Sequence, residues 1–169
     1  MRLRVLDVAS DQTGSALVEF TILLPVLLFL TLGLAQFGNI YYNYILVTNA
    51  TAAGARQFSI GRLDSNDYCD TVNAINNGSG GLGGSGTCTS NLTITLAVNG
   101  TACATGAGSA NNAPCQTALT NAYLAAASPP QAASVTVSYQ CSANSLLPAY
   151  LLNLASLCPA TRTMQGAVQ

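Results

Sequence analysis

The N-terminal third of the chain carries one long apolar stretch. Residues 20–40 read FTILLPVLLFLTLGLAQFGNI and contain no charged side chain. At 1.5 Å of rise per residue, a helix of this length reaches about 31 Å, enough to cross the hydrocarbon core of a bilayer. Tyr41, Tyr42 and Tyr44 follow directly, and their amphipathic rings favour the headgroup layer. The pattern predicts one transmembrane helix.

The same helix is expected to continue beyond the membrane. Residues 43–59 keep apolar side chains at helical spacings and contain no proline, so the helix should run to about Ser59 and stop at Gly61. This divides the chain into an N-terminal leader of residues 1–14, a helix of residues 15–60 and a head of residues 61–169.

The head alternates short patterned segments with loops. The periodicity predicts a helix over 66–76 and a second over 113–127, with strands at 92–98, around 135–139 and at 161–168. Asn99-Gly100 is a strong turn signal after the first strand. We expect a flexible, unpacked loop at 77–86 and another loop at 101–113. The expected fold is α+β, with a short antiparallel sheet and one or two short helices in the head.

Six cysteines occur in the head and none before it: Cys69, Cys88, Cys103, Cys115, Cys141 and Cys158. Scattered cysteines in a small exported head favour disulfides, and six of them allow 15 pairings that sequence does not separate. A zinc site is the alternative, but CxxC-like pairs and histidine are missing. Because disulfides belong outside the cytoplasm, the cysteines orient the chain with its N-terminus in the cytoplasm and the head outside.

Composition restricts the possible functions. Only 7% of residues are charged and no residue is histidine, so nucleic-acid binding and Ser-His-Asp or Cys-His catalysis are not expected. Asp64, Asp67 and Asp70 are spaced by three and could bind calcium, but acids at the start of a helix need no metal. We expect no enzyme activity, no metal and no cofactor. A membrane-tethered enzyme would have to work without histidine.

An acidic residue, Glu19, stands at the entrance to the apolar helix. Acids in a first turn favour the helix dipole and can reach the interface, so Glu19 has a simple structural explanation. An ordinary secretory signal has a shorter apolar core and a small-residue cleavage site, which this segment lacks, whereas an uncleaved signal anchor stays open. Within the helix, Pro25 should bend the axis, while Gly33 and Gly38 leave flat patches for a neighbouring helix.

A longer set of residues resembles a known family. The run Gly14-Ser15-Ala16-Leu17-Val18-Glu19-Phe20 is similar to the recognition sequence of prepilin peptidase. Together with Leu23-Leu24-Pro25, Gly33, Phe37-Gly38, Tyr42 and the Ala-rich end at Gly54-Ala55-Arg56, it resembles the TadE-like pseudopilins or minor pilins of the tight-adherence (Tad/Flp) pilus, over residues 14–56.

The resemblance implies specific roles for these residues. Gly14 and Ser15 would flank the cleaved bond, Glu19 and Phe20 would set the register of assembly, and Pro25, Gly33, Gly38 and Gly54 would serve helix packing. The implied partners are prepilin peptidase, membrane lipid, the inner-membrane assembly machinery and other pilins or pseudopilins. The implied protein is a structural or assembly subunit in the bacterial inner membrane with a periplasmic head, which enters the pilus or assists its assembly. The alternative is an uncleaved, single-span surface adhesin or binding module.

Overall fold

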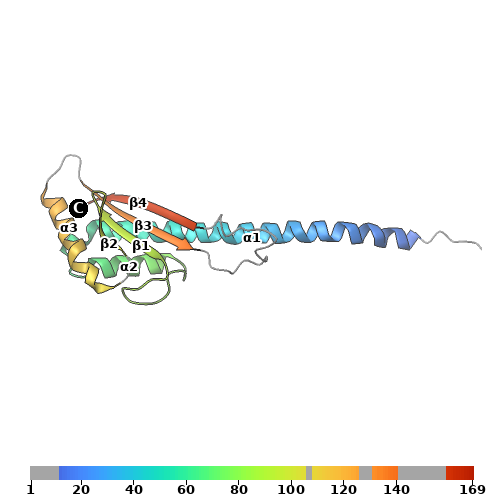
Figure 1. The fold of residues 1–169 in the computed structure, drawn as a ribbon, viewed down its shortest axis with the longest axis horizontal. Helices are drawn as coiled ribbons and strands as arrows, with labels where there is room; N and C mark the ends of the chain where they lie inside the picture. The colour runs from blue at the N-terminus through green and yellow to red at the C-terminus, as the bar shows by residue number, and fades with distance from the viewer. Residues whose placement is uncertain (1–11, 106–107, 126–130, 141–158) are drawn as a thin grey trace, which may run out of the picture.

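The chain forms one long helix and a head built from short helices and a sheet (Figure 1). The computed structural model describes residues 12–105, 108–125, 131–140 and 159–169. In chain order the elements are α1 (Gln12–Ile60), η1 (Gly61–Leu63), α2 (Asp67–Gly78), β1 (Thr93–Val98), β2 (Thr101–Thr105), η2 (Ser109–Asn111), α3 (Asn112–Leu124), β3 (Ala132–Gln140) and β4 (Pro159–Ala167). The predicted α+β class is confirmed.

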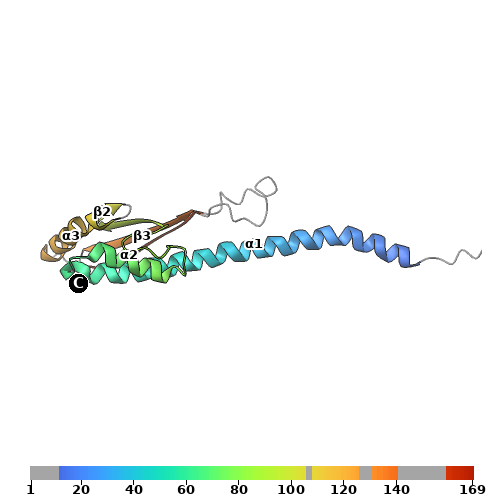
Figure 2. The same cartoon turned by 90° about the horizontal axis from the view of Figure 1, so that it is seen from below.

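Helix α1 is continuous over 49 residues, about 74 Å at the usual rise. Its N-terminal part extends away from the head, and its C-terminal part lies alongside the sheet and α2 (Figures 1 and 2). Pro25 lies inside the helix without ending it. The helix ends at Ile60, where Gly61 opens a 3-10 turn, so the predicted end near Ser59 is confirmed to within a residue.

The sheet is antiparallel with strand order β2-β1-β3-β4. Asn99 and Gly100 join β1 to β2, and both have positive φ angles, 51° and 79°, as the tightest hairpin turns require. The turn predicted from Asn99-Gly100 is confirmed. The prediction of a loop at 101–113 is wrong, because the hairpin places residues 101–105 opposite β1, where their backbone pairs despite small side chains.

The final strand, β4, pairs with β3 over its whole length, as predicted. Alternation gives the sheet two different faces. The inner face is aliphatic and buried, with Ile94, Leu96, Val98, Ala133, Val135 and Val137. On the outer face, hydroxyl groups meet across the two strands: Thr136 with Thr163 at 2.8 Å and Ser138 with Thr161 at 2.9 Å.

Three helices complete the core beside the inner face. Val47 and Phe58 of α1 are fully buried, and so are Tyr68 and Ile75 of α2. The predicted apolar face of α2 is therefore confirmed. Helix α3 adds Leu119, also fully buried, and lies across the end of the head farthest from the start of α1 (Figure 1).

The glycine-rich segment after α2 packs more closely than expected. Ser79 is fully buried and its hydroxyl accepts a 2.9 Å hydrogen bond from the backbone N–H of Gly83. The Gly83 carbonyl accepts a 2.9 Å bond from the N–H of Asn91. The prediction of an unpacked loop at 77–86 is wrong, because its glycines let the backbone approach these partners and adopt positive φ, 59° at Gly80.

Two disulfides tie these elements together. Cys69–Cys88 links α2 to the loop after it, and Cys103–Cys115 links β2 to α3. The prediction of disulfides is confirmed for these four cysteines, while Cys141 and Cys158 lie outside the described residues.

Candidate functional site

The predicted processing and register residues occupy the start of α1. Gly14 and Ser15 have helical backbone, so the bond predicted to be cleaved lies inside the helix. Glu19 follows Ser15 by four residues, which places the two positions on the same face, one turn apart. Phe20 is 59% exposed. The start of α1 thus presents an acid and an aromatic ring on open helix surface.

Around and beyond Glu19, from Leu17 onward, α1 exposes an apolar surface that the described head does not cover. Large side chains remain open along this stretch, from Leu17, 68% exposed, to Leu34, 72% exposed. One helix of the described residues is long and apolar enough to cross a membrane, and its most apolar window has a mean hydropathy of 2.3. Such a surface requires hydrocarbon or other helices around it.

The threonine hydroxyls of this segment are compatible with hydrocarbon. The hydroxyl of Thr21 donates to the carbonyl of Leu17 at 2.7 Å, and that of Thr31 donates to the carbonyl of Leu27 at 3.0 Å. A hydroxyl bonded to its own helix leaves no unpaired donor in lipid.

The three glycines predicted to serve helix packing have different surroundings. A Cβ added at Gly33 or Gly38 would meet no atom within 4 Å, so both glycines lie on open helix surface. A Cβ added at Gly54 would lie 2.5 Å from Cγ1 of Ile75 and 3.4 Å from Cγ1 of Val135. Gly54 therefore lets α1 approach α2 and β3 within the head.

Where α1 leaves its apolar stretch, an aromatic and cationic group joins it to the head. The rings of Tyr41 and Tyr44 stack at a centroid distance of 6.5 Å. The guanidinium carbon of Arg162, on β4, lies 4.0 Å from the centroid of the Tyr44 ring. Cation–π contacts of this kind attach β4 to α1 at the predicted membrane interface. The sequence assigned no contact to Arg162, since the two residues are distant in the chain.

The three aspartates at the start of α2 differ in environment. Asp67 is fully buried, and neither of its carboxyl oxygens has a hydrogen-bond partner in the described part of the chain. Burial, and then the charges of Asp64 and Asp70, raise the pKa of Asp67 to about 7. Its Oδ1 occupies the place that a Cβ at Gly61 would take.

The other two aspartates interact with each other. The Asn66 N–H donates to Asp64 at 2.9 Å, and this bond, followed by a hydrogen bond with Asp70, lowers the pKa of Asp64. The same bond with Asp64 raises the pKa of Asp70. Among the described residues, no group of three metal-ligating side chains could hold an ion. The arrangement is an acid pair beside a buried third carboxyl.

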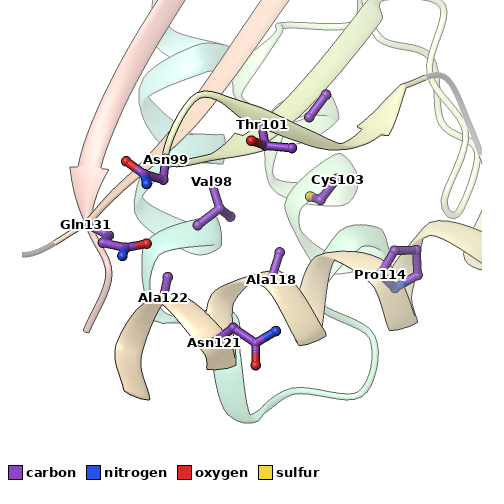
Figure 3. A pocket seen from close by; sticks show the side chains of 10 residues that line it. Val98, Asn99, Thr101, Cys103, Pro114, Ala118, Asn121, Ala122 and Gln131 are labelled. Carbon is purple, nitrogen blue, oxygen red and sulfur yellow. The ribbon is translucent and has the colours of Figure 1, made fainter. Parts of the chain in front are cut away.

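A pocket of about 450 Å³ lies between the β1–β2 hairpin and α3 (Figure 3). Asn99 and Thr101 lie along its hairpin side, and Asn121 lies on α3. The sequence did not predict this pocket, although it did predict the Asn99-Gly100 turn that forms one edge. Its second wall depends on the Cys103–Cys115 pairing, which sequence does not reveal.

The fold and this helix define the class: within the residues that the structure describes, one helix able to span a membrane carries a disulfide-linked α+β head. The sequence model of the TadE-like protein family matches residues 14–56, which confirms the resemblance to that family over this part of α1. The matched segment ends inside α1 and leaves the head outside it. No curated protein and no solved structure matches the chain significantly.

Proposed function

We propose that the chain is a pseudopilin or minor pilin, a structural or assembly subunit of a bacterial Tad pilus. It is cleaved by prepilin peptidase between Gly14 and Ser15 and acts in pilus biogenesis and surface adhesion. The observation that carries the proposal is the open apolar surface of α1, headed by Glu19 within the TadE-like segment.

One helix surface can serve two successive environments. Before assembly the exposed side chains of α1 contact lipid, and after assembly they contact the helices of other pilins or pseudopilins. Both are apolar, so the transfer needs no change in the head. Gly33 and Gly38 have free space where side chains would stand, which permits a neighbouring helix to approach closely.

Glu19 sets the register of this packing. Cleavage would create a positively charged amine on Ser15, one helical turn from the Glu19 carboxylate or within reach of it on a neighbouring subunit. Pairing removes most of the cost of placing a charge in lipid, whereas an unpaired charge penalises every wrong stagger.

The proposed orientation places residues 1–14 in the cytoplasm and the head in the periplasm. The two disulfides of the head support this orientation, because disulfides persist in oxidising compartments. The inner-membrane assembly machinery would then meet the helix and its cytoplasmic end.

Processing is tested by the mass of the mature protein. We expect Ser15 as the first residue of the chain purified from membranes of its host, and Met1 after substitution Gly14→Val. A host strain lacking prepilin peptidase is the control and should also retain Met1. Finding Met1 in the unmodified strain contradicts processing and supports the uncleaved surface adhesin instead.

Register is tested by the variant Glu19→Ala. We expect normal membrane insertion but at least about a tenfold loss of pili per cell, because a charge pair in lipid is worth more than about 1.4 kcal/mol. The matched control is Thr21→Val, which removes a polar group bonded only to its own helix. Normal piliation with Glu19→Ala contradicts the role in register, whatever the outcome of the processing experiment.

A further inference from the structure

The pocket between the β1–β2 hairpin and α3 lies at the end of the head opposite the N-terminal end of α1 (Figures 1 and 3). On a chain anchored through α1, this is the part that extends farthest from the membrane. Its volume of about 450 Å³ falls within the range of small-ligand sites.

The polar lining of this pocket is dense and uncharged. Three carboxamides, those of Asn99, Asn121 and Gln131, and the hydroxyl of Thr101 border it, and none of the described residues that line it is charged. Each carboxamide offers two donors and an acceptor. In the part of the chain that the structure describes, none of the three side-chain amides forms a hydrogen bond with another residue, so these groups are available to a ligand.

The rest of the pocket is apolar. Val98 and Ala122 are buried at its base, and Ala118 adds a methyl group from α3 (Figure 3). Because the side chains at these positions are small, the apolar floor of the pocket carries no large projecting group. A flat apolar face of a ligand can lie on this floor while its edges meet the amides above.

The walls of the pocket are held in place. The backbone N–H of Asn99 donates to the carbonyl of Ala132 at 2.8 Å and fixes the hairpin turn. The Cys103–Cys115 disulfide joins the hairpin covalently to α3. A site on fixed walls loses little entropy when it binds, which favours recognition of a specific shape.

From these observations we infer that the pocket binds a neutral carbohydrate of one or two sugar rings. An ionic ligand would lose its water without gaining a countercharge, and a purely apolar ligand would leave the amides unpaired. A neutral sugar satisfies both surfaces, since its hydroxyls pair with amides and its C–H face lies on the methyl groups. The inference deepens the adhesion part of the proposed function, but it requires neither processing nor assembly.

The test measures binding on the purified full chain by saturation-transfer NMR. The detergent is lauryldimethylamine oxide, because glycosidic detergents would compete for the pocket. The probes are lactose, maltose and N,N′-diacetylchitobiose. We expect transfer to at least one of them with a Kd of about 1 mM or below, equivalent to about 4 kcal/mol of binding free energy.

Two variants each remove one of the three amides without disturbing the fold. Asn99→Gly keeps a residue that accepts positive φ in the turn, and Asn121→Ala shortens an exposed side chain on α3. Each should weaken binding at least about fivefold, the loss of one hydrogen bond, and Ala118→Phe should abolish it by filling the pocket. The control, Thr117→Ala, changes the same helix outside the lining and should bind normally.

Two results would overturn the inference: no transfer to any of the three sugars at about 20 mM, far above the expected Kd, or unchanged binding in both amide variants. Thermal melting of each variant shows whether the head is folded. Because the experiment needs no pilus, its failure leaves the processing and register results untouched, and failure of those leaves the binding measurement valid.

Discussion

Gly61 and Asp67 depend on each other within the turn between α1 and α2. The Asp67 carboxyl fills the space beside the Gly61 backbone, where any larger side chain would collide with it. The carboxyl is fully buried and lacks hydrogen-bond partners in the described part of the chain, so its neutral form is favoured. The pKa of about 7 places the ionisation of Asp67 in the physiological range.

This shift makes the stability of the head depend on pH. Below about pH 4 both the folded and the unfolded chain hold the proton on Asp67. Between the ordinary value of 3.8 and about 7, the unfolded chain releases this proton while the folded chain retains it, so stability falls as pH rises. Above about pH 7 the loss is complete and reaches up to about 4 kcal/mol.

The variant Asp67→Asn should abolish this pH dependence. It stays neutral, so its melting temperature should change little between pH 5 and pH 8 and should exceed that of the unmodified chain at pH 8. Asp64→Asn is the control: its carboxyl has a lowered pKa and titrates below this range, so most of the slope should remain. Parallel melting profiles for the Asp67→Asn variant and the unmodified chain would refute the buried neutral carboxyl.

Only part of this residue-scale information could be predicted from the sequence. It located the three aspartates at the start of a helix, but not which of them is buried, because burial depends on how η1 and α3 close over the turn. The cysteine pairing was equally hidden. Cys69 pairs with Cys88 and Cys103 with Cys115 because of positions in space that periodicity does not encode.

Among the elements, α1 has two regions with opposite packing. One region exposes its apolar side chains, and the other packs closely against α2 and the sheet, with a tight contact at Gly54. Replacing a glycine therefore has a different effect on the stability of the head in each of the two regions. Gly54 is confined by Ile75, whereas Gly38 has open space around it.

The variant Gly54→Ala should destabilise the head. The added methyl group overlaps Ile75, which costs about 1–3 kcal/mol, while the better helix propensity of alanine recovers up to about 1 kcal/mol. We expect a lower melting temperature of the purified chain. In the Ile75→Ala background the same substitution should be neutral or stabilising, because the colliding atoms are gone.

The control for this cycle is Gly38→Ala, which should leave the melting temperature of the head unchanged. If Gly54→Ala costs the same in both backgrounds, the collision with Ile75 is not the cause and the close approach of α1 to α2 is refuted. An effect of Gly38→Ala on pilus formation alone would instead support packing between subunits.

At the scale of elements, regular hydrophobic patterns were sufficient to predict secondary structure. Segments of small residues led to wrong predictions. The alternation in β1 and β3 and the apolar face of α2 identified their elements. Residues 101–105 looked like a loop because they are small and polar, yet pairing with β1 makes them a strand. The glycines of 77–86 looked flexible for the same reason, although buried hydrogen bonds at Ser79 order part of this segment.

For the whole molecule, the order of the elements was predictable apart from β2, and their arrangement in space was not. One helix, a small head and a mixed α+β content follow from composition and periodicity. The strand order β2-β1-β3-β4 and the pocket at the far end of the head arise from contacts between distant segments. Contacts of this kind cannot be predicted from the local pattern of any single segment of the sequence.

Because α1 is continuous, it also fixes the rotational angle between the head and the apolar part of the helix. Since no described break separates its lipid-compatible region from the region packed in the head, the helix transmits rotation about its axis. One residue inserted near Asn39 would turn the head by about 100° relative to the membrane-embedded face and lift it by about 1.5 Å. Seven inserted residues would restore the angle to within about 20°. The number of residues in this helix therefore sets the rotational orientation of the head about the helix axis. That orientation decides which way the pocket faces in any assembly that the helix joins.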